Sequence, residues 1–243
     1  AHFRIPASYM MKSKTDCEDL LAAVRRDIDQ STSTRNVHWI SKDVKEHYSE
    51  GLSLYEDGSL QEIIKRYERR CGSTGKKLVF QRYIDQPLLY RDKYKFVQTT
   101  FLLVTSSEPL VAFYHPGYIK YSKEKYSGRK DPLEDNHRRH FPNLGEEQKT
   151  ENSRAHNITY AQANLFKSDQ LPHPHYYTDN LMPQIENSLI NMLMMGKENM
   201  LPGKGYFEIF AVDYIVDNDR NVWLMKATRD PNFSSVMWKL KTK

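Results

Sequence analysis

Residues 206–231, YFEIFAVDYIVDNDRNVWLMKATRDP, decide how the C-terminal part of this chain folds. Two apolar runs flank the polar segment 217–221, and this pattern predicts a β-hairpin. One acid, Asp213, interrupts the first run. Lys226 and Thr228 stand near the end of the second run, where a metal-binding hairpin would carry further oxygen ligands. The hairpin therefore has the shape of a metal site with a cation where a ligand is expected.

The chain has 243 residues, of which 39% are apolar and 12% aromatic. These values are typical of one large domain or two lobes and argue against global disorder. No apolar run approaches the roughly 20 residues that span a bilayer. Cys17 and Cys71 have no metal-ligand spacing, so we expect free thiols in a reducing compartment. The chain opens without a Met, which leaves open that it is a fragment or a processed product.

The formal charge is +5 and the pI is about 9.0. A basic balance favours an acidic partner, and charge alone does not choose among nucleic acid, an anionic membrane and an acidic protein surface. A solvated basic surface without a specific partner is the plain alternative. The candidate basic residues are Arg25, Arg26, Lys65, Arg66, Arg69, Arg70, the pair Arg138 and Arg139, and the tail 239–243.

Hydrophobic periodicity predicts helices over 15–29, 59–71 and 180–196. Thr15 or Asp16 is the expected cap of the first helix. Strands are expected within 37–40, 51–57, 77–84, 95–107 and 110–122, besides the hairpin. Residues 127–155 are polar and charged, which is typical of a loop or insertion. Helices that alternate with hairpins predict an α+β fold with largely antiparallel sheets.

Several of these segments together resemble the tubulin tyrosine ligase-like family. The similar segments are LVFQRYIDQPLLY, KFVQTTFLLVT, IKYSKEKYS and the hairpin, in the family's order from about residue 3 to residue 231. The resemblance implies an ATP-grasp-like fold, with central and C-terminal lobes forming a single domain over 1–243. It leaves open whether an N-terminal lobe is absent. Members of this family use ATP and Mg²⁺ to join an amino acid to a tubulin carboxylate through an acyl-phosphate.

The resemblance also assigns a vestigial nucleotide pocket, made of Lys42, the hinge residues Gln81, Arg82, Tyr83 and Ile84, and Lys120. Other positions depart from the family pattern. Glu50 falls where the family's phosphate loop carries arginine, and its negative charge would repel phosphate. Val97 and Thr99 replace an acid and an arginine that serve nucleotide and substrate. No residue is assigned a catalytic role.

The hairpin departs from the family most strongly. Asp213 keeps the first metal-binding acid, but Lys226 and Thr228 occupy the positions of a glutamate and an asparagine. Two like unit charges 4 Å apart repel by about 4 kcal/mol at an effective dielectric near 20, so a lysine there opposes a divalent ion. Lys226 would instead pair with Asp213 and take the place of the metal. The pattern predicts a pseudoenzyme with no cofactor.

The leading hypothesis is a non-catalytic family member that binds tubulin or a microtubule-associated assembly as a scaffold. It predicts the cytoplasm and cytoskeleton, with the axoneme of a cilium or flagellum as a natural setting, and neither membrane nor nucleic acid as partner. One alternative is an active ligase of glutamylase, glycylase or tyrosine-ligase type, with Glu208 or Asp217 as relocated ligands. Strand alternation places Glu208 and Asp213 on opposite faces. A further alternative is a nucleotide-binding module without turnover, and ATP belongs to the alternatives only.

Overall fold

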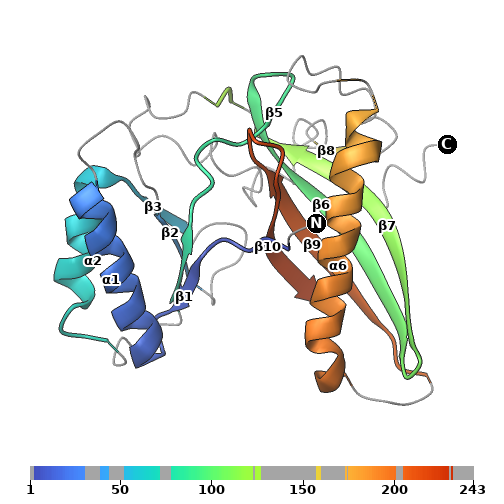
Figure 1. Cartoon of the computed structure of the whole chain (residues 1–243), viewed down its shortest axis with the longest axis horizontal. Helices are drawn as coiled ribbons and strands as arrows, with labels where there is room; N and C mark the ends of the chain where they lie inside the picture. Colours follow the sequence, from blue (N-terminus) through green and yellow to red (C-terminus); the bar gives the residue numbers. More distant parts are fainter. Residues whose placement is uncertain are drawn as a thin grey trace, which may run out of the picture.

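The computed structural model describes residues 3–30, 39–43, 52–71, 78–122, 124–126, 157–159, 173, 175–200, 205–229 and 231. Two antiparallel sheets lie side by side, and each is covered by helices on one face (Figure 1). The α+β class with antiparallel sheets flanked by helices is confirmed. The predicted insertion 127–155, Glu50, the pair Arg138 and Arg139 and the tail 239–243 lie outside the described residues.

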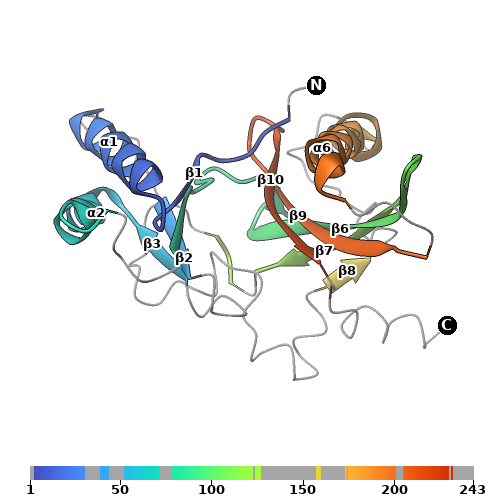
Figure 2. The ribbon, with the colours of Figure 1, turned by 90° about the horizontal axis from the view of Figure 1, so that it is seen from below.

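The first sheet has the strand order β1-β4-β2-β3. Its strands are β1 (Ser8–Met10), β2 (Trp39–Asp43), β3 (Leu52–Tyr55) and β4 (Leu78–Arg82). The helices α1 (Lys14–Gln30) and α2 (Leu60–Tyr67) lie together on one face, with the short turn η1 (Asp57–Ser59) before α2. In Figures 1 and 2 the labelled strands of this sheet stand between the two helices and the second sheet.

Helix α1 begins one residue before the predicted start, because Ser13 caps it. The Ser13 hydroxyl accepts a hydrogen bond from the Asp16 N–H, and the Ser13 carbonyl accepts the first helical bond from Cys17. This is the usual geometry of an N-terminal cap, so the prediction of Thr15 or Asp16 as the cap was wrong. Apolar residues of α1 and α2 then form one core with Trp39 and Phe80 of the sheet.

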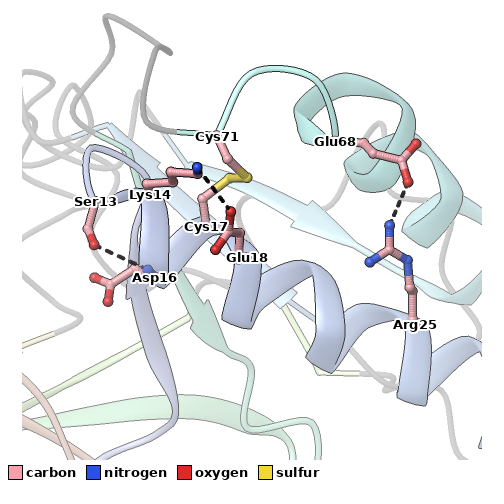
Figure 3. The surroundings of a disulfide bond; sticks show 8 residues. All are labelled: Ser13, Lys14, Asp16, Cys17, Glu18, Arg25, Glu68 and Cys71. Carbon is pink, nitrogen blue, oxygen red and sulfur yellow. Dashed lines mark hydrogen bonds and ion pairs between the residues drawn. A yellow bond between two sulfur atoms is a disulfide. The ribbon is translucent and has the colours of Figure 1, made fainter.

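A disulfide joins Cys17 in the first turn of α1 to Cys71, which follows α2 (Figure 3). The two Cα atoms are 5.4 Å apart although 54 residues separate them in sequence. The prediction of free thiols was wrong. The cause is tertiary, because the sheet aligns the start of α1 with the end of α2, and no spacing in the sequence reports that alignment.

The second sheet has the order β10-β9-β6-β7-β8, with β5 paired to β6. Its strands are β5 (Leu89–Tyr90), β6 (Tyr94–Ser107), β7 (Leu110–Tyr121), β8 (Asn157–Thr159), β9 (Glu208–Val216) and β10 (Val222–Arg229). The π-helical turn η5 (Tyr177–Leu181), helix α6 (Met182–Gly196) and the short turn η6 (Lys197–Asn199) follow one another, and α6 covers one face (Figure 2). The predicted hairpin 206–231 is confirmed as β9 and β10.

Alternate residues of β9 serve different faces of this sheet. Val212, Tyr214 and Val216 are buried in the core that includes Ile185 and Leu189 of α6. Residues of a strand that differ by an odd number point to opposite faces. Asp213 therefore lies on the face away from α6, which we name the site face.

A bulge in β7 sets the register of the site face beside β6. Gly117 has φ +72°, and a Cβ atom on it would lie 1.9 Å from the Thr99 carbonyl oxygen. The Gln98 side chain donates a 2.6 Å hydrogen bond to the carbonyl of Pro116, the residue before Gly117. Only glycine fits this close approach, and beyond it Tyr118 pairs with Thr99.

The segment before β1 connects the two sheets. Phe3 packs against the core of the second sheet. The Arg4 carbonyl accepts a hydrogen bond from Leu224 N–H of β10, and the Ala7 carbonyl accepts one from Arg82 N–H of β4. We name residues 3–7 the strap. Among the described residues no helix is long and apolar enough to cross a membrane.

Candidate functional site

The β-sheet brings Thr99, Asp213 and Lys226 into one row across three strands. Asp213 of β9 pairs with Thr99 of β6 on one side and with Lys226 of β10 on the other. A register shift between Leu224 and Lys226 places Lys226, rather than Met225, opposite the acid. Thr228 is opposite Ala211, two residues further along the same face. The three positions of the hairpin that the resemblance singled out therefore share the site face.

Thr99 contacts the Asp213 carboxylate directly. Its hydroxyl donates a hydrogen bond of 2.6 Å to Asp213 Oδ1, and the threonine side chain is almost fully buried. The sequence analysis identified Thr99 only as the residue at a position where the family carries arginine, and it did not predict this contact. We expected Lys226 to pair with Asp213. Lys226 lies opposite Asp213 and is exposed to solvent. The hydrogen bond to the Asp213 carboxylate comes from the Thr99 hydroxyl.

Lys42 reaches this group from the first sheet. Its Nζ donates a hydrogen bond of 2.7 Å to Gln81 Oε1, and Gln81 in turn donates to the Ser8 hydroxyl at 3.0 Å. Burial and the positive charge of Lys226 lower the pKa of Lys42 to about 8, with Asp213 acting in the opposite direction. Lys42 is therefore within electrostatic reach of both hairpin residues, and the structure brings these predicted positions together.

Lys120 of β7 is the second predicted cation on this face. Burial lowers its pKa, but the charges of Asp213 and Tyr118 outweigh burial, so the pKa of Lys120 is raised overall. Its Nζ lies 5.2 Å from the centroid of the Tyr118 ring. We name Asp213, Thr99, Lys42, Lys120 and Lys226 the Asp213 site.

Lys95 is a fully buried cation near this site that the sequence analysis did not select. Its Nζ donates a hydrogen bond to the Tyr83 hydroxyl and lies 3.9 Å from the centroid of that ring. Burial lowers the pKa of Lys95 to about 7; Asp85 raises it and Lys42 lowers it further. The signal in the sequence was present, because residues 95 and 99 differ by an even number and share a face of β6.

The predicted hinge residues do not all serve one side. Arg82 makes two hydrogen bonds to the Asp27 carboxylate of α1, at 2.5 and 3.0 Å, and its guanidinium lies 4.8 Å from the centroid of the Trp39 ring. Its neighbour Gln81 points to Lys42 on the opposite face. Tyr83 holds Lys95, and Ile84 is half-buried in the connection between the sheets.

The residues at this site do not fit Mg²⁺. In the part of the chain that the structure describes, no group of three His, Cys, Asp or Glu side chains converges to hold a metal. Asp217 accepts hydrogen bonds from the Asn221 backbone, the Asn221 amide and the Trp223 indole at 2.7–2.9 Å, which ties it to the hairpin turn. Glu208 is five residues from Asp213, roughly 17 Å along the strand, and on the other face.

An anion fits the site better than a cation does. Four lysines (Lys42, Lys95, Lys120 and Lys226) act on one another or on the two carboxylates Asp213 and Asp85. Burial is the main cause of the lowered pKa of both Lys42 and Lys95, and the charge of Lys226 lowers the pKa of Lys42 further. A bound anion would favour the charged form of both amines.

Comparison with known proteins adds a family to this geometry. The chain matches the model of the Tubulin-tyrosine ligase family over residues 5–240. It is 25% identical over 229 residues to "Tubulin monoglycylase TTLL3" of Homo sapiens, covering 90% of this chain and 29% of that protein. It is 23% identical over 206 residues to "Tubulin glycylase 3A" of Drosophila melanogaster, covering 81% and 20%.

A third relative is named as inactive. The chain is 25% identical over 163 residues to "Inactive polyglycylase TTLL10" of Homo sapiens, covering 63% of this chain and 23% of that protein. The chain thus spans less than a third of the length of each of these three relatives.

Proposed function

Because the chain belongs to the tubulin-tyrosine ligase family, we propose that it is a catalytically inactive member that associates with tubulin or a microtubule-bound assembly as a structural component. The observation that carries the proposal is the row across the hairpin: Lys226 opposite Asp213, with Thr99 donating to the same carboxylate. A divalent ion needs several oxygen ligands, and here one carboxylate is flanked by a hydroxyl donor and an ammonium group.

The choice of partner rests on charge and on the relatives. The chain carries a formal charge of +5, which favours association with an acidic protein surface. The relatives named above are tubulin glycylases and an inactive polyglycylase. We therefore place the protein in the cytoplasm and on the cytoskeleton, with the axoneme of a cilium or flagellum as the finer proposal.

An active ligase with relocated ligands is less well supported. Asp217 is held by three hydrogen bonds in the hairpin turn. Strand alternation puts Glu208 on the same face as Val212 and Tyr214, which pack against α6. Neither carboxylate would reach a metal bound to Asp213 without remodelling β9. This alternative would need ATP, Mg²⁺ and a carboxylate supplied by a residue outside these two.

A second candidate, nucleotide binding without turnover, is favoured by the lysines of the Asp213 site. Lys42 and Lys120 come from different sheets and both respond to Asp213. Lysine ammonium groups bind phosphate as point charges. In this candidate Lys226 supplies positive charge that a divalent ion would otherwise supply, so binding would not require Mg²⁺.

Calorimetric titration with ATP and ADP, with and without Mg²⁺, separates these readings. The wild type is compared with Lys226→Glu/Thr228→Asn, and Lys125→Glu serves as a control because Lys125 is exposed outside the site. The proposal predicts no Mg²⁺-dependent binding in the wild type or the control. Mg²⁺-dependent binding in the double variant would identify residues 226 and 228 as those that close the metal site.

Two further assays complete the test. Incorporation of labelled glycine, glutamate or tyrosine into tubulin by the wild type would contradict the proposal, as would ATP binding that Mg²⁺ strengthens. ATP binding that is equal with and without Mg²⁺ would select the second candidate. Microtubule co-sedimentation of the wild type, at near-physiological salt, tests the structural role itself.

A further inference from the structure

Helix α2 presents a row of cations to solvent. Lys65 and Arg66 of α2 are exposed, and the exposed Arg69 and Arg70 follow in the turn after the helix ends at Tyr67. Lys65 and Arg66 stand in the last turn of α2, so the cations gather at the C-terminal end of the helix. We name Lys65, Arg66 and Arg69 the α2 basic face.

The buried side of α2 fixes the direction of this face. Leu60 and Ile63 are 0% exposed and Tyr67 is 4% exposed, all within the core of the first sheet. The helix is therefore unable to rotate its cations toward the sheet without exposing that core. The guanidinium of Arg66 lies 5.7 Å from the centroid of the Tyr67 ring, which holds it close to the helix surface.

The fold gains little from so many cations at this place. Cations in the last turn of a helix interact favourably with its dipole, but like charges four residues apart repel each other. Two acids lie among these cations. Glu62 stands three residues before Lys65 and four before Arg66. Glu68 is paired with Arg25 of α1 at 2.5 Å. Its charge is therefore already met by a cation that belongs to another helix. The arrangement leaves a net positive surface that a partner can neutralise.

The end of α2 is held in place by two links to α1 (Figure 3). One is the pair of Arg25 with Glu68, and the other is the disulfide of Cys17 with Cys71 directly after the helix turn. A surface whose backbone is already fixed loses less entropy when it binds. The α2 basic face thus stands on a fixed backbone, unlike a flexible charged tail.

The α2 basic face is also separate from the Asp213 site. Helices α1 and α2 cover one face of the first sheet, whereas Lys42 and Gln81 lie on the opposite face. A ligand on α2 would therefore leave the Asp213 site open, and changes at either place can be made independently.

We propose that the α2 basic face is a docking surface for an acidic peptide segment, rich in glutamate or aspartate, of a protein partner. Carboxylates spaced along an extended segment match a cluster of exposed cations through charge-assisted hydrogen bonds. The inference deepens the proposed function, because it rests on tubulin or a microtubule-bound assembly being the acidic partner. It names the surface that holds that partner.

The test uses the full chain and a fluorescently labelled decaglutamate peptide, with binding followed by anisotropy at 50 and 200 mM salt. Lys65→Glu/Arg69→Glu is compared with Lys93→Glu/Lys125→Glu, a control with the same charge change at exposed lysines near the second sheet. Lys65→Gln/Arg69→Gln repeats the test without reversed charge. We expect the α2 variants to bind at least tenfold more weakly, while the control changes less than threefold.

Each remaining outcome has a definite meaning. Equal losses in the α2 and control variants would overturn the proposal, because net charge alone would then explain binding. Equal affinity of the wild type for decaglutamate and for a single-stranded RNA of the same charge would also overturn it. Loss of peptide binding with unchanged microtubule co-sedimentation would reject tubulin as the source of the peptide. Ligase activity of the wild type would reject the proposed function and leave the peptide result standing.

Discussion

Each sheet of this protein has a face that packs against helices and a face that carries polar chemistry. On β9, Val212 and Tyr214 pack toward α6 while Asp213, between them, meets Thr99 on the site face. On β4, Arg82 binds Asp27 of α1 while its neighbour Gln81 binds Lys42. Of two adjacent residues in these strands, one therefore contacts the helices and the other makes the polar contacts of the opposite face. A fold can keep its packed faces while the chemistry of the other faces changes.

Removing a ring from a packed face should give the largest effect. Tyr214 is 0% exposed in the core against α6, and truncation of a large buried aromatic residue costs about 3–5 kcal/mol. We expect Tyr214→Ala to lower the free energy of unfolding by this amount in urea titrations. Tyr206→Ala is the control, since Tyr206 is 64% exposed and should change stability by about 0.5 kcal/mol or less. Equal losses of stability in the two variants would show that burial against α6 does not set the cost of removing a ring.

Opening the disulfide tests the packed face of the first sheet. Cys17, in the first turn of α1, is 0% exposed, and the closed loop spans 54 residues. The chain-entropy model gives about 4 kcal/mol for a loop of this length, and about 2–4 kcal/mol is typical in practice. Reductant should lower the free energy of unfolding of the wild type within this range, measured by urea titration.

Cys17→Ala/Cys71→Ala is the reference for that measurement. Its stability should not respond to reductant, and it should resemble that of the reduced wild type. A wild type that is equally stable with and without reductant would show that packing alone holds α1 against α2.

A pH titration tests the site face, where polar groups are buried at the expense of stability. The pKa of Lys95 is about 7 in the fold, against 10.5 for an ordinary lysine. Between these values the unfolded chain binds more protons, so stability rises with pH, by up to about 1.4 kcal/mol per pH unit for one group. Below pH 7 the lysine is charged in both states and its burial is fully unfavourable.

Lys95→Met should therefore be more stable than the wild type at pH 6.5 and should lose most of the rise between pH 7 and 8. Above pH 8 a residual slope is expected from Lys42, whose pKa is lowered to about 8. Urea titrations at half-unit intervals of pH would measure both. An unchanged slope in Lys95→Met would mean that another group titrates in this range.

The smallest effect on stability is expected at the hairpin. Lys226 is exposed, and surface substitutions change stability by about 0.5 kcal/mol or less. Lys226→Glu places a second carboxylate opposite Asp213, and like charges opposite each other on paired strands repel, so the free energy of unfolding should fall by about 1 kcal/mol or less in urea titrations. A large loss of stability would mean that Lys226 holds the site together, and the two faces would then be less independent than the packing suggests.

The helices and strands could be predicted from the sequence because each depends on the local spacing of its apolar residues. The hairpin, α1, α2 and α6 all appear close to their predicted positions, and the prediction that Glu208 faces away from Asp213 follows from the alternation of β9. The same rule would have separated Gln81 from Arg82, because neighbours in a strand point to opposite faces. The resemblance grouped these two residues, and alternation assigns them to different sides.

Other features were beyond a local pattern. The pairing of Cys17 with Cys71 depends on how two helices align on a sheet. The contact of Thr99 with Asp213 depends on the register between β6 and β9, over 114 residues of sequence separation. The bulge between Leu224 and Lys226 decides which side chain faces the acid, and nothing in the sequence of β10 marks it. These are the interactions that give the Asp213 site its character.

The strap helps to fix the position of the first sheet relative to the β9–β10 hairpin. Two segments link the first sheet to the second: the strap, which contacts the second sheet without a covalent bond, and the covalent connection between β4 and β5. Arg4 attaches the first segment to Leu224, and Leu88 attaches the second to Val216 through a 2.8 Å backbone hydrogen bond. Both attachments are on the β9–β10 hairpin: Val216 belongs to β9 and Leu224 to β10. Because both bonds anchor the first sheet to the hairpin that carries Asp213 and Lys226, they limit how far Lys42 can move away from Asp213.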